Sequence, residues 1–208
     1  MFRLHGPVRA VKTSRGWAHI PFMGGLALLA MLSCVEPASA IQPGGPANYI
    51  IDNDTVQAAR TGDNETLREN LIKGISPNES GKDNIPMLIL AAGSGHLSTV
   101  KLLLEYGADP DRRAPDRATA LTIVSLANRA DIAEALLEAG ADPDKPGANR
   151  EVPLLIATRA RSSAIVEMLL RYGVDTGETD VTGRSALDLA EENHYRDIAV
   201  LLRTVAAQ

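Results

Sequence analysis

The sequence is poor in cysteine and in aromatic residues. Cys34 is its only cysteine, and two phenylalanines, one tryptophan and four tyrosines make up 3% of the 208 residues. A single cysteine cannot close an intramolecular disulfide, which excludes a disulfide-stabilised scaffold. Every phenylalanine and the tryptophan lie within residues 1–40. A core formed by the rest of the chain must therefore be built from Leu, Ile, Val, Ala and Met, with a few tyrosines.

Few residues are suited to catalysis or to metal binding. Beyond residue 40 the only histidines are His96 and His194, which lie too far apart to share a metal ion. The Gly-Ser-Gly around Ser94 lacks the outer glycines of a nucleophile elbow, and no glycine-rich segment follows a strand as in a phosphate-binding loop. We therefore expect no enzyme activity, no metal and no cofactor.

The first forty residues have the pattern of a secretory signal peptide. Four basic residues and no acid precede a short apolar stretch at 20–35, and Ala38-Ser39-Ala40 supplies the small residues of a cleavage site. The pattern predicts cleavage after Ala40 and export, with a bacterial periplasm as the expected location. Met31-Leu32-Ser33-Cys34 loosely resembles a lipoprotein box, so lipid anchoring through Cys34 is an alternative, and a retained membrane span is another.

Cleavage would leave a cysteine-free, acidic chain. Residues 41–52 are expected to be a flexible Pro/Gly lead-in, followed by one domain at 53–208. The mature chain would keep 17 basic and 25 acidic residues, a net charge of −8. That charge argues against nucleic acid or anionic lipid as the main partner, and we expect no membrane contact after cleavage.

Beyond residue 52 the sequence repeats with a period of 33 residues. Glycines and apolar residues recur at that spacing: Gly74, Gly107, Gly140 and Gly173; Leu88, Leu121, Leu154 and Leu187; Leu90, Ile123, Ile156 and Leu189. A fixed period of this length indicates a solenoid of stacked units, which present an extended surface to a partner. Aligned on the residue that opens the first helix, units one to five begin at Asn53, Pro86, Thr119, Val152 and Ser185.

Unit three illustrates the local structure that each unit predicts. Leu121 and Val124 fit a short apolar helix, and the spacing of Ile132 and Leu136 gives a second helix one apolar face. Gly140 follows at the position of a left-handed helix cap. The pairs Asp109/Asp111 and Asp142/Asp144, in the repeated sequence G-A-D-P-D, are interpreted as turn formers. The rest of the period predicts a projecting hairpin-like loop.

The pattern resembles the ankyrin repeat. Unit two reads P-M-L-I-L-A-A-G-S-G-H-L-S-T-V-K-L-L-L-E-Y-G-A-D-P-D, similar to the family's T-P-L-H-x-A-A-x-x-G-H-x-x-V-V-x-x-L-L-x-x-G-A-D-x-N. The resemblance covers residues 53–205. It implies an all-α solenoid of helix-turn-helix units with projecting hairpin loops, expected to be a monomer. The family's histidine is replaced by Ile89, Thr122, Leu155 and Asp188, so we expect these hairpins to be held mainly by apolar contact.

The resemblance also implies where a partner binds. In ankyrin arrays the hairpin tips and the exposed ends of the first helices line a concave, protein-binding face. Nine residues are predicted to contribute to it: Lys82, Ile85, Tyr106, Arg117, Leu126, Asn149, Arg159, Tyr172 and Arg184. For the two tyrosines the alternative is that each only covers a helix end.

Basic residues gather in units three and four, although the chain as a whole is acidic. They are Arg112, Arg113, Arg117, Arg129, Lys145, Arg150, Arg159 and Arg161. One interpretation is a basic centre that attracts an acidic protein patch, and the other is ordinary solvated surface. The expected function is protein binding outside the cytoplasm.

Two other functions remain open. The protein could serve as an accessory factor for an exported enzyme, such as a peroxide-detoxifying one, or as a secreted effector that binds a host protein. Three N-x-[ST] sequons, at Asn53, Asn64 and Asn78, matter only in a host that glycosylates secreted proteins.

Overall fold

The computed structural model describes residues 54–206, which form ten α-helices and one short 3-10 helix. The predicted signal peptide with Cys34 and Ala40, the lead-in and Asn53 lie outside the described residues. The helices are α1 Asp54–Thr61, α2 Asn64–Ile72, α3 Met87–Ser94, α4 Leu97–Glu105, α5 Ala120–Leu126, α6 Ala130–Glu138, η1 Ala148–Arg150, α7 Pro153–Arg159, α8 Ser163–Arg171, α9 Ala186–Glu192 and α10 Arg196–Ala206.

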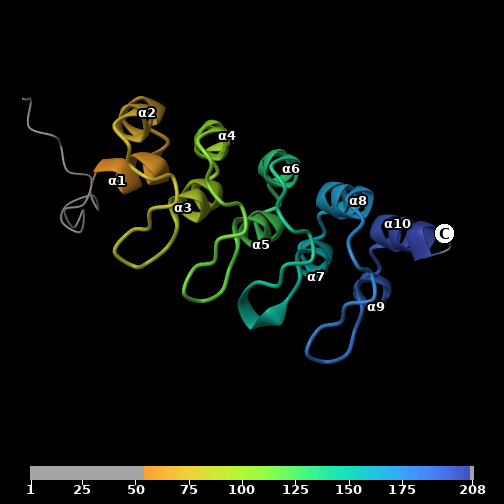
Figure 1. Ribbon diagram of the computed structural model, residues 1–208. Coiled ribbons are helices and arrows are strands. Elements are labelled where there is room, and N and C mark those ends of the chain that lie inside the picture. Colours follow the sequence, from red (N-terminus) through yellow and green to blue (C-terminus); the bar gives the residue numbers. More distant parts are fainter. Residues whose placement is uncertain (1–53, 207–208) are drawn as a thin grey trace, which may run out of the picture. The chain divides into compact units, whose positions relative to one another are not determined.

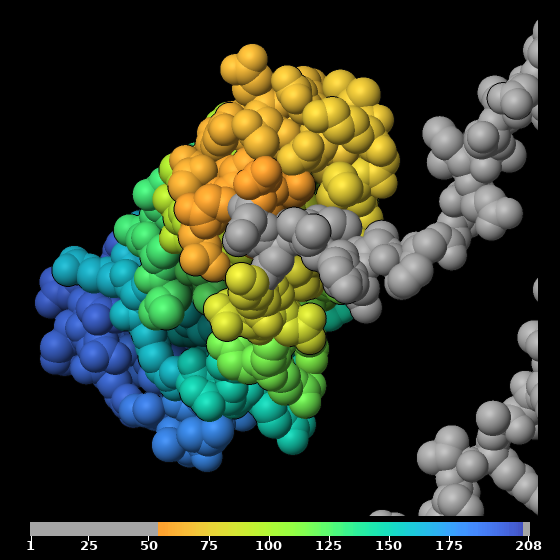
Figure 2. All heavy atoms as spheres, turned by 90° about the vertical axis from the view of Figure 1, so that its left-hand side faces the viewer, coloured from red at the N-terminus to blue at the C-terminus, as the bar shows by residue number. Residues whose placement is uncertain are grey.

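The helices form five antiparallel pairs stacked in two layers. The first helices of the units, α1, α3, α5, α7 and α9, pack against one another in chain order, and the second helices, α2, α4, α6, α8 and α10, form the other layer (Figure 1). Space filling shows the units following one another from orange to blue (Figure 2). Within residues 54–206 the only β contacts are two isolated bridges at hairpin bases. The predicted all-α solenoid is confirmed.

One continuous apolar core runs through the stack between the two layers. The second helices contribute Leu103, Leu136, Leu169 and Leu202, which are 33 residues apart and nearly inaccessible to solvent. Burying each leucine contributes about 1.5–3 kcal/mol. Because a unit has a neighbour on both sides, this burial depends on stacking and not on the unit alone.

Left-handed residues recur with the period and set the turns. Gly74, Gly107, Gly140 and Gly173 end the second helices with φ between 76° and 94°, as predicted for a helix cap. The turn inside each helix pair also contains a left-handed residue: Gly62, Gly95, Asn128, Arg161 and His194. Arg161 adopts this conformation while its guanidinium lies 5.4 Å from the ring centre of Tyr195, an attractive cation–π contact.

The hairpins are held partly by hydrogen bonds, which corrects the prediction of mainly apolar contact. Thr119 and Thr122 form a reciprocal capping box at the start of α5, and Ser185 and Asp188 form one at the start of α9. The prediction holds in units two and four, where Ile89 and Leu155 are buried and the helix has no side-chain cap. The Thr122 hydroxyl and the Asp188 carboxylate therefore take the place of the family histidine, and each accepts a hydrogen bond from the residue that caps its own helix.

A ladder of hydrogen bonds joins the turns of successive units. The backbone N–H groups of Asp109, Asp142 and Asp175 donate to side-chain oxygens of Asn78, Asp111 and Asp144, respectively, at 2.8–3.1 Å. Within each turn, Asp109, Asp142 and Asp175 accept from the backbone two residues later. The first acid of each pair is thus a turn former, as predicted, while the second reaches the next unit.

Candidate functional site

The hairpin loops and the exposed ends of the first helices form one surface, called the hairpin face below. Its loops span residues 79–86, 112–119, 145–152 and 178–185, each leading into a first helix. Each loop contains a turn closed by a backbone hydrogen bond, as between Arg117 N–H and the Ala114 carbonyl at 2.8 Å. The next bond joins Ala114 N–H to the Ala118 carbonyl at 2.9 Å. The same two bonds recur in all four loops, so equivalent positions can be compared directly.

A groove of about 320 Å³ lies on this face between the hairpins of units two and three. Apolar residues form most of its lining, with two carboxylates at its rim: Ile85, Ile89, Ala114, Pro115, Ala118 and Ile123, with Asp83 and Asp116. Asp116 accepts a hydrogen bond from the backbone of Ala118, which ties its carboxylate to its own turn. The groove is therefore an apolar site of the size of one side chain or a short peptide segment.

Two equivalent positions divide the hairpin face into halves. One is the loop exit at residues 85, 118, 151 and 184, and the other lies eight residues later at the end of the first helix. Units four and five place ion pairs there, between Glu151 and Arg159 and between Arg184 and Glu192. Units two and three place Ile85/Gly93 and Ala118/Leu126 at the same positions.

We call these two regions the charged half and the apolar half. Ala118 and Leu126 occupy the positions equivalent to Glu151 and Arg159, and Leu126 is the last residue of α5, the helix that contributes Ile123 to the groove lining. Its side chain is 68% exposed. An exposed leucine on a helix that also lines an apolar groove is the arrangement expected of a protein-binding patch.

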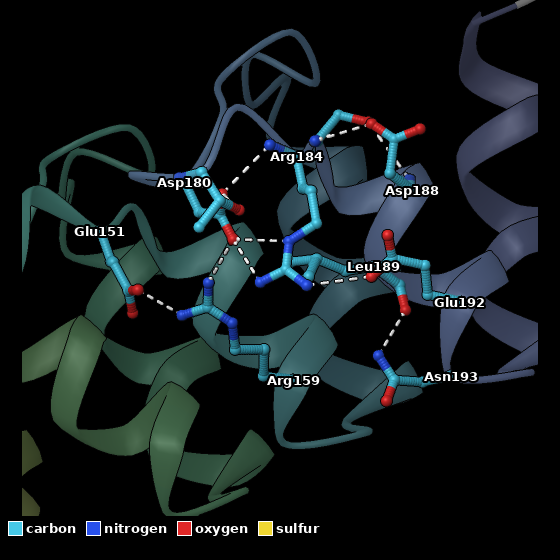
Figure 3. Close-up of polar contacts among 10 residues, drawn as sticks. Glu151, Arg159, Asp180, Arg184, Asp188, Leu189, Glu192 and Asn193 are labelled. Carbon is cyan, nitrogen blue, oxygen red and sulfur yellow. Dashed lines mark hydrogen bonds and ion pairs between the residues drawn. The ribbon is translucent and has the colours of Figure 1, made fainter.

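Asp180 organises the charged half (Figure 3). Its carboxylate, inaccessible to solvent, accepts hydrogen bonds from Thr182 Oγ1 at 2.6 Å, Arg159 Nη2 at 2.7 Å and Arg184 Nη2 at 3.0 Å. The Thr182 hydroxyl is the largest cause of a pKa of Asp180 well below the usual range, and bonds from the Arg184 and Thr182 backbone and the Arg184 side chain lower it further. The bond to Glu151 raises the pKa of Arg159. Both arginines of this half are therefore paired with carboxylates.

Seven of the nine predicted binding residues lie on the hairpin face. Leu126, Asn149 and Lys82 are exposed there, as is Arg117, and Ile85 is half buried in the groove wall. Arg159 and Arg184 are engaged with Asp180 and with Glu151 or Glu192. Tyr106 and Tyr172 instead follow the last residues of α4 and α8, in the other helix layer.

Half of the predicted basic centre, including Arg159, makes internal contacts. Arg129 donates to the Gly95 carbonyl at 2.7 Å, Lys145 pairs with Asp111 at 3.8 Å, and Arg161 lies over Tyr195. Arg117 and Arg150 occupy equivalent positions at adjacent hairpin turns and are exposed. Arg150 was part of the predicted basic centre but not of the predicted binding residues. Its left-handed backbone conformation cannot be inferred from its residue type.

A second hollow, of about 460 Å³, lies between α9 and α10. Its wall includes Glu191 and Arg203, which form a hydrogen-bonded ion pair at 2.6 Å. Within residues 54–206 there is no group of three or more His, Asp or Glu side chains placed to hold a metal ion, and no helix long and apolar enough to cross a membrane. Among the described residues, the apolar groove is therefore the stronger candidate for a binding site.

Comparison with known protein families finds a match to ankyrin repeats, in three copies, over residues 55–147. Residues 55–147 are ankyrin repeats. Units four and five continue the same 33-residue alternation of helices beyond the matched residues. Ankyrin repeats are protein-binding modules in general, and the proteins that carry them are typically non-enzymatic. The comparison with curated proteins found no match.

Proposed function

We propose that this ankyrin-repeat protein is exported and binds a protein partner on the apolar half of its hairpin face. The observation that carries the proposal is Leu126, 68% exposed at the end of α5, the helix that contributes Ile123 to the apolar groove. Its equivalents in the charged half, Arg159 and Glu192, are held by ion pairs. The apolar side chain of Leu126 is removed from water only when a partner covers it.

The stacked fold supports binding by a preformed surface. The backbone of each hairpin is closed by hydrogen bonds and the first helices beneath it belong to the continuous core. A partner therefore meets a surface that needs little ordering, which lowers the entropic cost of association. Export is proposed from the pattern of residues 1–40 together with a cysteine-free remainder of the chain.

The binding proposal is tested by affinity capture from the cell-envelope fraction, with the full-length chain tagged at its C-terminus as bait. Leu126→Glu removes the apolar contact and places a charge at the end of α5, so the captured partner is lost or its binding is weakened about tenfold or more. The matched control is Val181→Glu, because Val181 is 83% exposed on the hairpin of unit five, in the charged half. The control retains the partner.

Both variants keep the parent's circular dichroism and thermal midpoint, because both positions are exposed. Equal capture by the parent and by Leu126→Glu would overturn the proposal for this surface. Export is checked separately on the same tagged protein, by fractionation and N-terminal sequencing. Periplasmic protein beginning at Ile41 supports the proposal, whereas a cytoplasmic chain beginning at Met1 contradicts it.

A further inference from the structure

Two arginines at the hairpin turns adopt a backbone conformation that glycine adopts more easily. The equivalent turn positions are Asn84, Arg117, Arg150 and Gly183, and all four have positive φ, between 59° and 83°. A non-glycine residue in the left-handed region is strained relative to glycine, because its Cβ approaches the following carbonyl oxygen. At Arg150 the residue before it, Asn149, is left-handed as well, with φ 56°. Glycine is the preferred residue at the second position of such a turn.

Neither arginine gains an internal contact that offsets the strain. Arg161, a third left-handed arginine, lies over the ring of Tyr195. Arg117 and Arg150 are exposed, and neither has an ion pair or side-chain hydrogen bond with the described residues. Glycine, which occupies the equivalent position at Gly183, would fit the backbone conformation better at both positions. The arginines therefore contribute what glycine cannot, namely their guanidinium groups. Strained residues of this kind concentrate at binding sites.

Charge on either side of the pair restricts what binds there. Arg117 lies between Asp116 and Ala118, two residues of the groove lining, and Arg150 lies at the equivalent turn one unit further along the hairpin face. Beyond them Arg159 and Arg184 are neutralised by Glu151, Asp180 and Glu192. Asp83 and Asp116, from the hairpins of units two and three, belong to the groove lining. An anionic group is therefore attracted at the two turns and repelled by the carboxylates of the groove.

We propose that the partner is a protein segment with one apolar side chain followed by acidic residues. Its apolar side chain enters the groove between units two and three, and its carboxylates pair with Arg117 and Arg150. The mostly acidic surface elsewhere disfavours other registers for such a segment. This inference rests on the proposed function and names the chemistry of its partner.

The test uses purified protein from cells expressing the full-length tagged chain. The probe is a short fluorescein-labelled peptide with one leucine followed by a run of glutamates in a Gly/Ser background. Its anisotropy is measured at low salt, because exposed ion pairs weaken as salt rises. A second peptide replaces the glutamates by glutamine, and a third replaces the leucine by serine. The first peptide binds, and both replacements weaken its binding.

Arg117→Gly and Arg150→Gly separate binding from folding. Each variant relieves left-handed strain and raises the thermal midpoint by about 2–4 °C. Each also weakens peptide binding by about twofold to fivefold, the amount carried by one exposed ion pair. Asn84→Gly is the matched control, since it introduces glycine at the equivalent position without removing a charge. Asparagine adopts the left-handed region more readily than arginine, so the midpoint rises less, and peptide binding stays unchanged.

Three outcomes overturn the inference. One is equal binding of the glutamate and glutamine peptides, and a second is unchanged peptide binding by both arginine variants. The third is tighter binding of a labelled single-stranded DNA or of anionic phospholipid vesicles, because the arginines would then serve a different class of partner. If Leu126→Glu abolishes capture of an envelope protein while the glutamate peptide fails to bind, the inference fails and the proposed function stands.

Discussion

Arg159 donates a 2.7 Å hydrogen bond from its Nη2 to the carboxylate of Asp180, across the boundary between units four and five. The carboxylate belongs to the hairpin of unit five and the guanidinium to the last residue of α7. Arg184, from the same hairpin as Asp180, donates to the same oxygen at 3.0 Å. One ionised carboxylate therefore orients two arginines and links two units.

Acid should weaken this link. Because the pKa of Asp180 is lowered in the fold, its stabilising effect is fully present above its unfolded pKa of about 4 and is lost as the pH falls through the folded pKa. Asp180→Asn should therefore destabilise the protein at pH 7 and reduce the difference in unfolding free energy between pH 7 and pH 3. Urea unfolding of parent and variant at both pH values measures this.

Some acid sensitivity will remain in Asp180→Asn. Hydrogen bonds from the Thr66 side chain and from Ser185 lower the pKa values of Asp63 and Asp188, respectively, with the same sign. An equal loss of stability in parent and variant between pH 7 and pH 3 would show that Asp180 does not contribute.

Asp111→Ala should remove one rung of the turn ladder. The variant leaves the Asp142 N–H without its 3.1 Å acceptor and Lys145 without its partner carboxylate. We expect a loss of about 1–2 kcal/mol in the free energy of unfolding. Asp111→Asn is the control, because Asn78 already performs the equivalent role for Asp109 with a 2.8 Å bond. Two variants of equal stability would argue that the ladder is not stabilising.

Thr119→Ala should uncap α5. Its hydroxyl accepts from Thr122 N–H at 3.3 Å, and Thr122 Oγ1 accepts from Thr119 N–H at 2.9 Å. Loss of the cap should lower the free energy of unfolding by about 1 kcal/mol. Thr119→Ser keeps the hydroxyl and should retain most of that free energy. Thermal denaturation of both variants distinguishes the cap from the lost methyl group, since a serine variant as unstable as the alanine variant would assign the effect to packing.

Two glycine-to-alanine changes should have opposite signs. Gly140 has φ 89° and open space around an added Cβ, so Gly140→Ala should destabilise by about 1 kcal/mol through backbone strain alone. Gly93 lies within α3, and an added Cβ would meet Ile123 Cγ2 at an ordinary 3.6 Å. Gly93→Ala should stabilise by about 0.5–1 kcal/mol. Chemical denaturation tests the pair, and equal signs would contradict the assigned backbone geometry.

Local signals in the sequence were enough to predict the fold. Helix starts followed from period and apolar spacing, and each first helix beyond unit one begins one residue after the residue chosen to open it. The recurring glycines at Gly140 and its equivalents predicted the helix caps, because glycine is the residue that most readily adopts a left-handed conformation. Arg117 and Arg150 are left-handed without being glycines, so their strain is evident only from their backbone dihedral angles.

The site was harder to predict because it depends on contacts between units. Arg159 and Leu126 occupy equivalent positions and were both predicted to bind a partner, yet Arg159 meets Glu151 and Asp180 while Leu126 meets solvent. Whether a side chain is already paired depends on the neighbouring hairpin, which a single unit does not encode. For the same reason Asp111 was interpreted as a turn former, and its bond to Asp142 was not anticipated.

The turn ladder has an evolutionary consequence. Units one and two each contribute to it an acceptor oxygen facing the following unit, from Asn78 and Asp111, and units two and three receive them with a backbone N–H at Asp109 and Asp142. A tandem duplication of one internal 33-residue block would reproduce both halves of this connection in register, with no compensating substitution. The array can therefore lengthen or shorten by whole units over evolutionary time, changing the extent of its surface while each junction remains satisfied.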